Sequence, residues 1–511
     1  MNSTKLWRWT IAVAIVLALI GLGAKLAEPA ATSYTRSALL KGLQKDYETQ
    51  VGDLQVRLFP GVHVTIRDLV LHQKDRPGAP PLIETKEVSV SAGWTDVIRK
   101  HVGEVVLTGL KIQVPPRRAS EQPHHGSSKI AGFVIDTIIA DGTILEVYPK
   151  DPEKEPLGFE IHQLTLHGAG PDQPMTFQAT LRNARPPGEI HSSGKFGPWE
   201  AEEPAATPVS GSYTFRDADL SVFKGIAGTL SSDGSYQGVL DHISVQGKTD
   251  TPDFTVRISG RPVHLTTQFQ AVVDGTSGNT YLDPVNGQFG RSSLVARGSV
   301  AGERGKKGKT VALDVSVKDG RLEDMLRLAV KPDTSTNDSV MTGAISFHTK
   351  LVIAPGDVDI AQKLRLDGAF EVGQAHFSEL NVQEKVNSLS HRGKGDPKES
   401  PDASVASDFN GSFKLDNGIV TFPKLSFNVP GISVALSGNF GLLDQHLDLH
   451  GTARLEAKLS QTTTGVKSFL LKAVDPFFEK KNAGAVIPIE IGGTSSSPKF
   501  GLDIGGHRVG P

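Results

Sequence analysis

The chain has 511 residues, 54 Lys and Arg against 56 Asp and Glu, and no cysteine. A formal net charge of −2 gives no basic field to hold a phosphate backbone, so we expect no nucleic-acid partner. The missing cysteine excludes disulfides, thiol nucleophiles, cysteine-ligated metals and lipid attachment through an N-terminal cysteine. Any membrane anchor of this chain therefore has to be peptide.

The N-terminus carries one long apolar run. Residues 9–24 are almost unbroken in their hydrophobicity, and the stretch 6–26 is just long enough to span a bilayer. Lys5 and Arg8 precede the run and only Lys25 follows it closely, a bias that places the N-terminus on the cytoplasmic side. A cleaved signal peptide is the alternative, but no good Ala-x-Ala site follows the run. We expect an uncleaved single-pass anchor and one exported body.

Beyond the anchor, apolar and polar residues alternate with period two in segment after segment. This pattern is typical of strands that have one apolar and one polar face. Turn-forming pairs separate the segments and favour antiparallel hairpins in long succession. The expected fold is mainly β, an N-terminal transmembrane helix followed by a long, mostly antiparallel sheet with few short helices. The turn pairs are Asp141-Gly142, Asp233-Gly234, Asp274-Gly275, Asp319-Gly320 and Asn417-Gly418.

Apolar residues at helical spacing predict three helices, over residues 322–329, 379–390 and 464–482. The third is the most strongly amphipathic, and Asp475-Pro476 kinks it or starts a second short helix. We expect this helix to cap the far end of the sheet, because an open terminal strand invites pairing with another chain. The alternative is that it lies on an anionic membrane surface. Its apolar residues are Val466, Phe469, Leu470, Val474, Phe477 and Phe478.

Two stretches without periodicity, rich in Pro, Gly, Ser and charge, divide the body. They predict a linker and a loop between three β regions. The expected organisation is an anchor over 1–30, an N-terminal β region over 31–118, a linker over 119–130, a central β region over 131–390, a loop over 391–404, a C-terminal β region over 405–505 and a frayed tail over 506–511.

No constellation of residues supports catalysis. Residues 302–310 look like a phosphate-binding loop, but they lack the required glycine spacing and Thr310 opens a strand, so a hairpin turn fits better. His124 and His125 have no further metal ligand in their segment, and the pair Asp357 and Asp359 lacks the spacing of a calcium loop and predicts a turn. The Ser-x-x-Lys stretch at 221–224 has no Lys-Thr-Gly partner. We expect no enzyme, no metal and no cofactor.

Both ends of the body resemble a known family. At the start the resemblance lies in residues 51–115, with VGDLQVRLFPGVHVTIRDLVLH and then the strand of TKEVSVSAGW and Gly-Leu-Lys-Ile. At the end it lies in PGISVALSGNFGLLDQHLDLHGTARL and in IPIEIGGTSSSPKFGLDI, which closes on Gly493, Thr494, Pro498, Lys499 and Phe500. These segments resemble the two ends of the AsmA-like family of bacterial envelope proteins anchored in the inner membrane.

The resemblance implies an elongated, twisted β-groove, related in architecture to bridge-like lipid-transfer proteins. It implies a single-pass inner-membrane protein with a cytoplasmic N-terminus and a periplasmic body, acting in outer-membrane biogenesis and homeostasis. Phospholipid acyl chains and the inner membrane are the implied partners, with other envelope proteins as possible ones. No catalytic residue is carried over. The chain is short for the family, which leaves open whether one copy reaches the outer membrane.

Two functions from different classes remain open. A lipid conduit needs a continuous apolar lining, because each exposed CH₂ group costs about 0.8 kcal/mol. A structural scaffold for the assembly or targeting of outer-membrane proteins would instead pack its apolar faces into closed sandwich cores without lipid. The alternation of the strands is the same in both, so the deciding observation is an open trough or a closed core. The inward positions that we expect to face lipid are Val64, Ile66, Leu110, Ile112, Val256, Ile258, Leu313, Val315, Val434 and Leu436.

Overall fold

The computed structural model describes residues 28–511 with gaps, so the predicted anchor over 6–26, the linker over 119–130 and the amphipathic helix over 464–482 lie outside the described residues. Within the described part, no helix is both long and apolar enough to cross a membrane. The gaps are 45–46, 59–60, 75–77, 94, 97–98, 100, 117–133, 150–155, 171–172, 201–202, 304–307, 331–340, 379, 397–404, 463–483, 495–496, 505–506 and 510–511.

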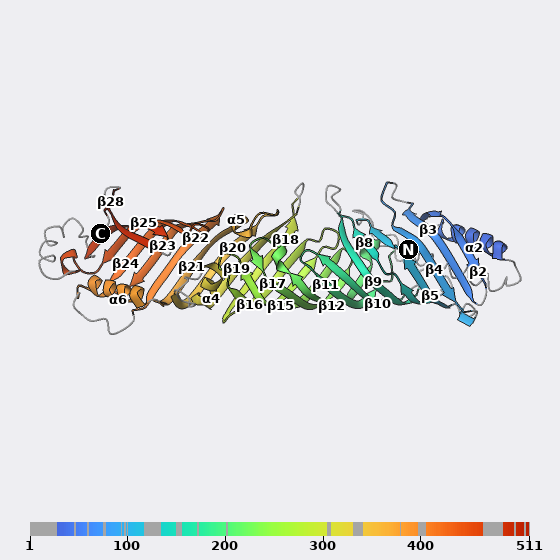
Figure 1. Cartoon of the computed structure of the whole chain (residues 1–511), viewed down its shortest axis with the longest axis horizontal. Coiled ribbons are helices and arrows are strands. Elements are labelled where there is room, and N and C mark those ends of the chain that lie inside the picture. Colours follow the sequence, from blue (N-terminus) through green and yellow to red (C-terminus); the bar gives the residue numbers. More distant parts are fainter. Residues whose placement is uncertain are drawn as a thin grey trace.

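The alternating segments form one sheet of 28 strands, which confirms the mainly β, mostly antiparallel prediction. From β9 onward nearly every strand pairs antiparallel with the strand that follows it, as hairpins require. The parallel pairs found among the described strands are β5 with β7 and β6 with β8. Figure 1 shows the result, an elongated body whose strands cross the long axis obliquely in chain order.

The N-terminal section contains β1 (Tyr47–Val51), β2 (Leu54–Arg57), β3 (Val62–Gln73), β4 (Ile83–Ala92), β5 (His101–Thr108), β6 (Lys111–Val114), β7 (Val134–Ile139), β8 (Thr143–Val147) and β9 (Leu157–Ala169). The middle section contains β10 (Met175–Ala184), β11 (Pro187–Phe196), β12 (Pro208–Asp219), β13 (Ile226–Ala227), β14 (Thr229–Val239), β15 (His242–Val256), β16 (Pro262–Val273), β17 (Thr280–Phe289), β18 (Ser292–Gly302), β19 (Lys309–Arg321), β20 (Met341–Ile353) and β21 (Leu364–Phe377). The C-terminal section contains β22 (Ser407–Asp416), β23 (Ile419–Val429), β24 (Ile432–Gly441), β25 (His446–Leu455), β26 (Ala485–Thr494), β27 (Ser497–Ile504) and β28 (His507–Val509).

Helices are short and lie at the margins of the sheet. The α-helices are α2 (Glu28–Leu43), α4 (Leu322–Ala329), α5 (Ile360–Lys363) and α6 (Leu380–Lys394), and the 3₁₀ helices are η1 (Pro204–Ala206), η2 (Leu220–Val222) and η3 (Leu459–Thr462). In Figure 1, α2 covers the N-terminal end of the sheet, and α4 and α6 lie along one of its long sides. The predicted helix over 322–329 is confirmed as α4.

The connections between strands define two long edges from β9 onward. We call the edge that carries α4 and α6 the helix edge; it also holds residues 185–186, 220–228, 257–261 and 290–291. The other, which we call the opposite edge, holds residues 197–200, 203–207, 240–241, 274–279, 303, 308, 354–363 and 417–418. Successive connections alternate between the two edges because each hairpin reverses the chain.

The predicted loop over 391–404 is wrong at its start, because α6 continues to Lys394. Tertiary contacts stabilise the extra turn: the backbone N–H of Ala457 donates to the carbonyl of Gly393 at 2.8 Å. A Cβ atom at Gly393 would lie 2.3 Å from Cγ1 of Ile432, so only glycine allows this close approach to β24. Basic residues in the last turn also favour the negative end of the helix dipole.

Three other local predictions are also corrected. Asp233-Gly234 lies inside β14, and Asp319-Gly320 lies inside β19, where a bulge gives Asp319 a φ of 51°. The predicted tail contains β28, which pairs with β27. In each case the pairing with a neighbouring strand overrides a local preference for a turn or for fraying.

Candidate functional site

One face of the sheet is apolar from β3 to β26, and the pairing register traces it from strand to strand. Residues directly opposite each other on neighbouring strands share a face, so each paired residue leads to the next. Every residue of this trace is aliphatic, aromatic or glycine. We call this face the inner face. The trace runs through Val64, Val90, Val105, Ile138, Leu166, Phe177, Gly194, Gly211, Tyr236, Val245, Ala271, Leu282, Gly298, Leu313, Leu351, Leu366, Leu415, Val420, Phe440, Leu447 and Gly493.

Burial of the inner face changes along the molecule. In the N-terminal section Val64 and Val90 are 1% and 0% exposed, and they belong to a closed core that also contains Leu39 and Leu43 of α2. In the middle section most large inner residues, such as Phe177, Leu282, Leu313 and Leu351, are only half-buried. The structure therefore combines a closed core at one end with an apolar face in the middle on which several large side chains are only half-buried.

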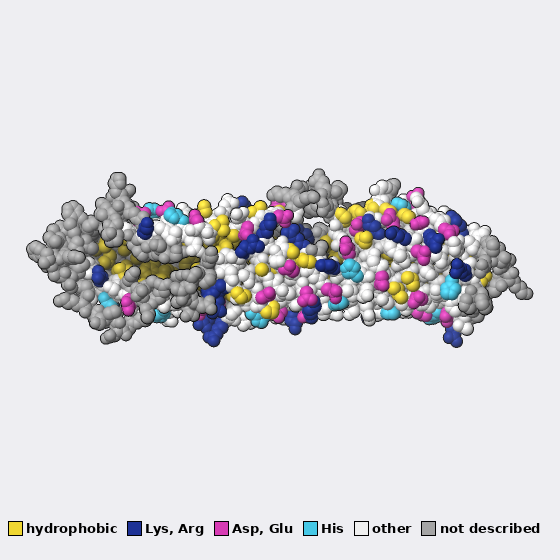
Figure 2. Space-filling model, viewed as in Figure 1, with side chains coloured by type: hydrophobic (Ala, Val, Ile, Leu, Met, Phe, Trp, Pro, Cys, Tyr) yellow, Lys and Arg dark blue, Asp and Glu magenta, His cyan; other side chains and the backbone are white. Residues whose placement is uncertain are grey.

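The C-terminal section is intermediate between these two. Val434 and Leu436 are 7% and 8% exposed and pack in a core that includes Val386 of α6. Figure 2 shows a hollow floored with hydrophobic side chains at this end of the body, where Figure 1 places β22 to β25. Half-buried apolar residues from the neighbouring strands, such as Phe427 and Ile489, pack against the same core.

The two edges of the sheet approach each other across the inner face. A Cβ atom at Gly278, on the opposite edge, would lie 3.4 Å from both Cδ atoms of Leu157, at the start of β9 on the helix edge. Further along, the backbone N–H of Ile360, on the opposite edge, donates to the carbonyl of Lys224 on the helix edge at 2.8 Å. Because the strands are tilted, each edge meets a part of the other that is several strands away.

These contacts show that the sheet curls so that its two edges meet at these points over the inner face. Large side chains of the inner face, such as Phe177, Leu282 and Leu351, are only half-buried between these contacts, whereas Phe289 and Val317 are 2% and 3% exposed.

The predicted lipid-facing residues are distributed over all three sections. Val64, Ile66 and Leu110 are 1%, 1% and 6% exposed in the N-terminal core, and Ile112 packs against that core, so these four contact protein. The prediction that the strand continues through Ile258 is wrong, because a turn after β15 begins at 257 and the N–H of Gly260 returns to the carbonyl of Val256 at 2.9 Å. Val256, Leu313 and Val315 are half-buried in the middle section, whereas Val434 and Leu436 lie in the C-terminal core.

A belt of hydroxyl groups crosses the inner face in the middle section, which sequence reasoning missed. The hydroxyls of Ser192 and Tyr236 are 2.7 Å apart, and those of Thr249 and Thr267 are also 2.7 Å apart. The hydroxyls of Tyr213 and Ser232 form a third pair, 3.1 Å apart. The pairing register places the residues of all three pairs on the inner face. Burial raises the pKa of Tyr213 and of Tyr236, so both phenols stay neutral.

Glycine makes room for the tyrosine rings of this belt. A Cβ atom at Gly234 would lie 2.6 Å from Cε1 of Tyr213, so the ring lies over the glycine of the neighbouring strand. Small residues beside large ones are typical of strongly curved sheets, where the inner side chains converge. Asp233-Gly234 therefore does not form the predicted turn. Its glycine makes room for the ring of Tyr213.

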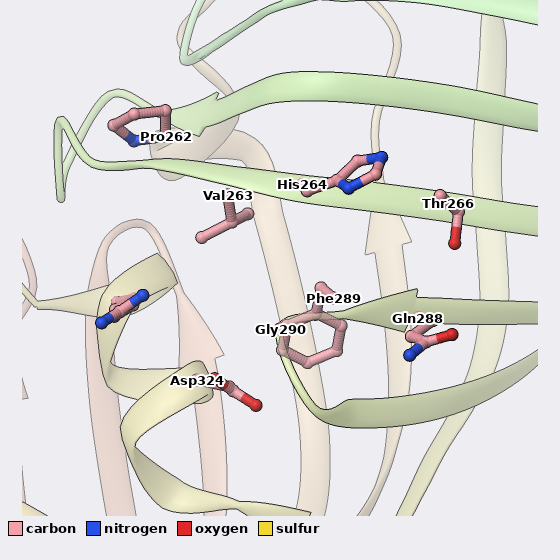
Figure 3. A pocket seen from close by; sticks show the side chains of 9 residues that line it. Pro262, Val263, His264, Thr266, Gln288, Phe289, Gly290 and Asp324 are labelled. Atoms are coloured by element: carbon pink, nitrogen blue, oxygen red, sulfur yellow. The ribbon is translucent and has the colours of Figure 1, made fainter.

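A pocket of about 390 Å³ lies at the helix edge between the start of β16, the β17–β18 turn and α4 (Figure 3). Its buried carboxylate, Asp324, accepts hydrogen bonds from the N–H of Arg291 and the hydroxyl of Ser292, both at 2.8 Å. This carboxylate therefore stabilises the turn, and we assign no reaction to the pocket. The lining residues are Pro262, Val263, His264, Thr266, Gln288, Phe289, Gly290, Asp324 and Arg327.

Other predicted motifs have structural explanations or lie outside the described residues. Lys309 and Thr310 begin β19 after a hairpin connection, as predicted, so these two residues open a strand and not a helix. Across the described ranges, no three His, Cys, Asp or Glu residues gather closely enough to hold a metal ion. His124 and His125 and the apolar residues of the predicted end-cap helix, 466–478, fall in the gaps.

No protein-family model matches this chain, and neither the curated proteins nor the solved structures contain a match. The resemblance to the AsmA-like family therefore stays a prediction that rests on the two terminal segments.

Proposed function

We propose that this protein is a non-enzymatic cell-envelope protein that binds phospholipid along its inner face and transfers it between membranes. The observation that carries the proposal is the unbroken apolar trace from β3 to β26, on which several large side chains of the middle section are only half-buried between two bridged edges. We interpret this part of the inner face as the lining of a channel. A soluble protein gains nothing from leaving such a face unfilled, because contiguous exposed apolar surface marks a binding site or an aggregation hazard.

The energetics of lipid transfer require a lining of this kind. Two acyl tails of about 16 carbons each cost about 20 kcal/mol or more when exposed to water, and only continuous apolar contact offsets that cost. Strands lie about 4.8 Å apart, so the inner face from β10 to β26 extends roughly 70 Å along the sheet. That length is about twice the 30 Å hydrocarbon thickness of a bilayer, which leaves room for several lipids in a row.

The cellular placement of this proposal comes from the sequence. Residues 6–26 and the flanking positive charges support an inner-membrane anchor with the body in the periplasm. The resemblance to the AsmA-like family adds a role in outer-membrane biogenesis and homeostasis, with other envelope proteins as partners.

The test is the lipid content of the full-length protein, purified in mild detergent and measured by mass spectrometry. We expect phospholipid at a reproducible molar ratio, and we expect its loss when Leu313→Glu and Leu351→Glu place two carboxylates opposite each other on the inner face. Lys350→Glu, on the polar face of the same strand, is the matched control and should retain lipid. A wild-type protein free of lipid would contradict the proposal.

One observation favours the scaffold function for part of the molecule. The N-terminal section has a closed core in which Val62, Leu69 and Val88 are 0% exposed, so it offers no hollow for a ligand. A lipid-free wild-type protein that still assembles with an envelope protein through this section would favour the scaffold.

A further inference from the structure

Residues 354–363, which we call the strap, join β20 to β21 at the opposite edge but contact the helix edge. Besides the hydrogen bond from Ile360 to Lys224, the guanidinium of Arg185 donates to the carboxylate of Asp357 at 2.9 Å. Arg257 lies 3.9 Å from the carboxylate of Asp359. Since Arg185 and Asp357 are 172 residues apart in the chain, these contacts connect two distant parts of one sheet across the channel.

Three cations from three separate turns face the strap. Arg185 comes from the β10–β11 turn, Lys224 from the connection after β12, and Arg257 from the turn after β15. The ring of Phe223 lies 5.4 Å from the guanidinium carbon of Arg185 and holds it in place by a cation–π contact. Several cations that come together from separate turns are a typical arrangement for binding an anionic group.

In this structure, two carboxylates of the strap, those of Asp357 and Asp359, pair with the arginines. The hydrogen bond and the positive charge of Arg185 lower the pKa of Asp357, so this carboxylate is ionised at neutral pH. Asp359 is held by its own segment, because its carboxylate accepts a hydrogen bond from the N–H of Ala361 at 2.9 Å and begins α5. The side chains of Arg185 and Asp357 are 53% and 75% exposed, and such exposed ion pairs contribute little, so a better ligand can replace them.

The inner face supplies no charge beneath the strap. Positions paired around the hydroxyl belt are apolar, glycine or hydroxyl-bearing, from Ile190 on β11 to Val273 on β16. A lipid whose acyl chains lie on this face therefore has to keep its phosphate where the two edges meet at the strap, because an unpaired anion inside the channel is strongly unfavourable. We call this meeting line of the two edges the seam.

We propose that Arg185, Lys224 and Arg257 bind the phosphate of a phospholipid headgroup, and that Asp357 and Asp359 of the strap occupy this site in the absence of lipid. The phosphate then competes with the two carboxylates, the strap leaves the helix edge, and the seam opens for the headgroup. This inference rests on the proposed lipid function and adds to it a headgroup site and a gate.

Removing the competing charges tests the site. Asp357→Asn with Asp359→Asn should raise the affinity of the full-length protein for fluorescent phosphatidylglycerol by about threefold to tenfold, and Asn at 359 keeps the helix cap. Arg185→Gln with Arg257→Gln should lower that affinity by at least as much and leave the binding of fluorescent diacylglycerol, which has no phosphate, unchanged. The matched controls are Asp283→Asn and Arg297→Gln, from an exposed pair on β17 and β18, and both should bind both lipids as the wild type does.

A reversible lock tests the gate. The chain has no cysteine, so Arg185→Cys with Asp357→Cys gives two unique thiols that a reducible bis-maleimide can join. The lock should slow phosphatidylglycerol transfer between vesicles about tenfold or more relative to the same double-cysteine variant before cross-linking, and reduction should return the rate to that of the uncross-linked variant. The same linker between cysteines at 283 and 297 is the control and should leave transfer unchanged.

The outcomes separate the two proposals. If the wild type binds neither lipid, the lipid function fails and this inference fails with it. If the wild type binds lipid but the charge variants and the locked protein match it, the channel function stands and the headgroup site is wrong. Displacement of phosphatidylglycerol by millimolar inorganic phosphate alone would show a free-phosphate site and would also overturn the proposal.

Discussion

The N-terminal and middle sections have the same strand pattern and differ in what their inner faces contact. In β3 and β4 the inner positions are valines and isoleucines that are almost completely buried, and the core also includes Trp199 and Ala205 from the opposite edge. In β10 to β21 several large inner residues, such as Phe177, Leu282 and Leu351, are only half-buried, although others, such as Phe289 and Val317, are 2% and 3% exposed. Strand periodicity therefore reports that a face is apolar, and not whether that face is filled.

The size of the inner side chains explains much of the difference. In the N-terminal section the trace from Val64 to Leu166 is unbroken by glycine, so side chains fill the space between the curled parts of the sheet. In the middle section Gly194, Gly211 and Gly298 interrupt it. At Gly211 the hydroxyl of Tyr236 lies close to where a Cβ atom would be, so a ring from the neighbouring strand covers the glycine.

The largest expected effect is the contrast between a charge in the core and a charge in the channel. Val64→Asp should cost about 4 kcal/mol or more in the free energy of unfolding, because it buries an unpaired carboxylate. Leu313→Asp should cost about 1 kcal/mol, because water reaches its position. Urea unfolding followed by circular dichroism measures both, and equal losses would mean that the middle section is a closed core as well.

A smaller loss of stability is expected where the tyrosine rings of the hydroxyl belt pack on glycines of the neighbouring strands. Gly234→Ala places a Cβ atom 2.5 Å from the carbonyl of Gln246 and against the ring of Tyr213, and should cost about 1–3 kcal/mol. Tyr213→Phe removes only the hydrogen bond to Ser232 and should cost about 1 kcal/mol. Thermal unfolding of the two variants checks this order, and a neutral Gly234→Ala would show that the wall of the channel is loosely packed.

The connection over residues 274–279, which approaches β9, makes a contribution to the free energy of unfolding that depends on pH. Although burial opposes it, hydrogen bonds from Thr276 and Ser277 lower the pKa of Asp274 below its unfolded value of 3.8. The stability that this carboxylate contributes is therefore present above the unfolded pKa and is lost as the pH falls through the folded pKa. Asp274→Asn should destabilise the protein by about 1 kcal/mol at pH 7 and by less below pH 3.8. A difference in unfolding free energy that grows on acidification would contradict this assignment.

The smallest effect belongs to the polar face outside the channel. Arg297 and Asp283 form an ion pair at 2.7 Å whose side chains are 61% and 75% exposed. Arg297→Ala should change the free energy of unfolding by less than about 0.5 kcal/mol. A larger loss, measured in the same urea experiment, would mean that this face packs against another surface.

Much of the secondary structure is predictable from the chain alone. The period-two segments at 62–66, 311–317 and 432–436 are strands, and the stripe from Leu322 to Ala329 is a helix, because both patterns depend on local backbone geometry. Ile258, Asp233-Gly234 and the last turn of α6 were not predictable in this way. Their conformation depends on strand pairing and on contacts with residues that are distant in the sequence.

The candidate site was only partly predictable for the same reason. Alternation identified Leu313 and Val315 as inward, and it identified Val64 and Ile66 equally well, although these lie in a closed core. Asp357 and Asp359 appeared in the sequence as an ordinary turn. Their partners Arg185 and Arg257 come from other hairpins, and no local pattern connects them.

The sequence by itself determined the strands, the apolar side of each strand and the succession of hairpins, because alternation and turn chemistry act over a few residues. Only the tertiary structure decided that the sheet curls, that its edges meet at the strap, and which residues of the inner face are buried in a core. Curling depends on how side chains of different size converge on one face, and on contacts between edges that are far apart in the chain, such as that of Arg185 with Asp357. The tertiary structure therefore separates a closed core from a candidate lipid channel within one repeating pattern.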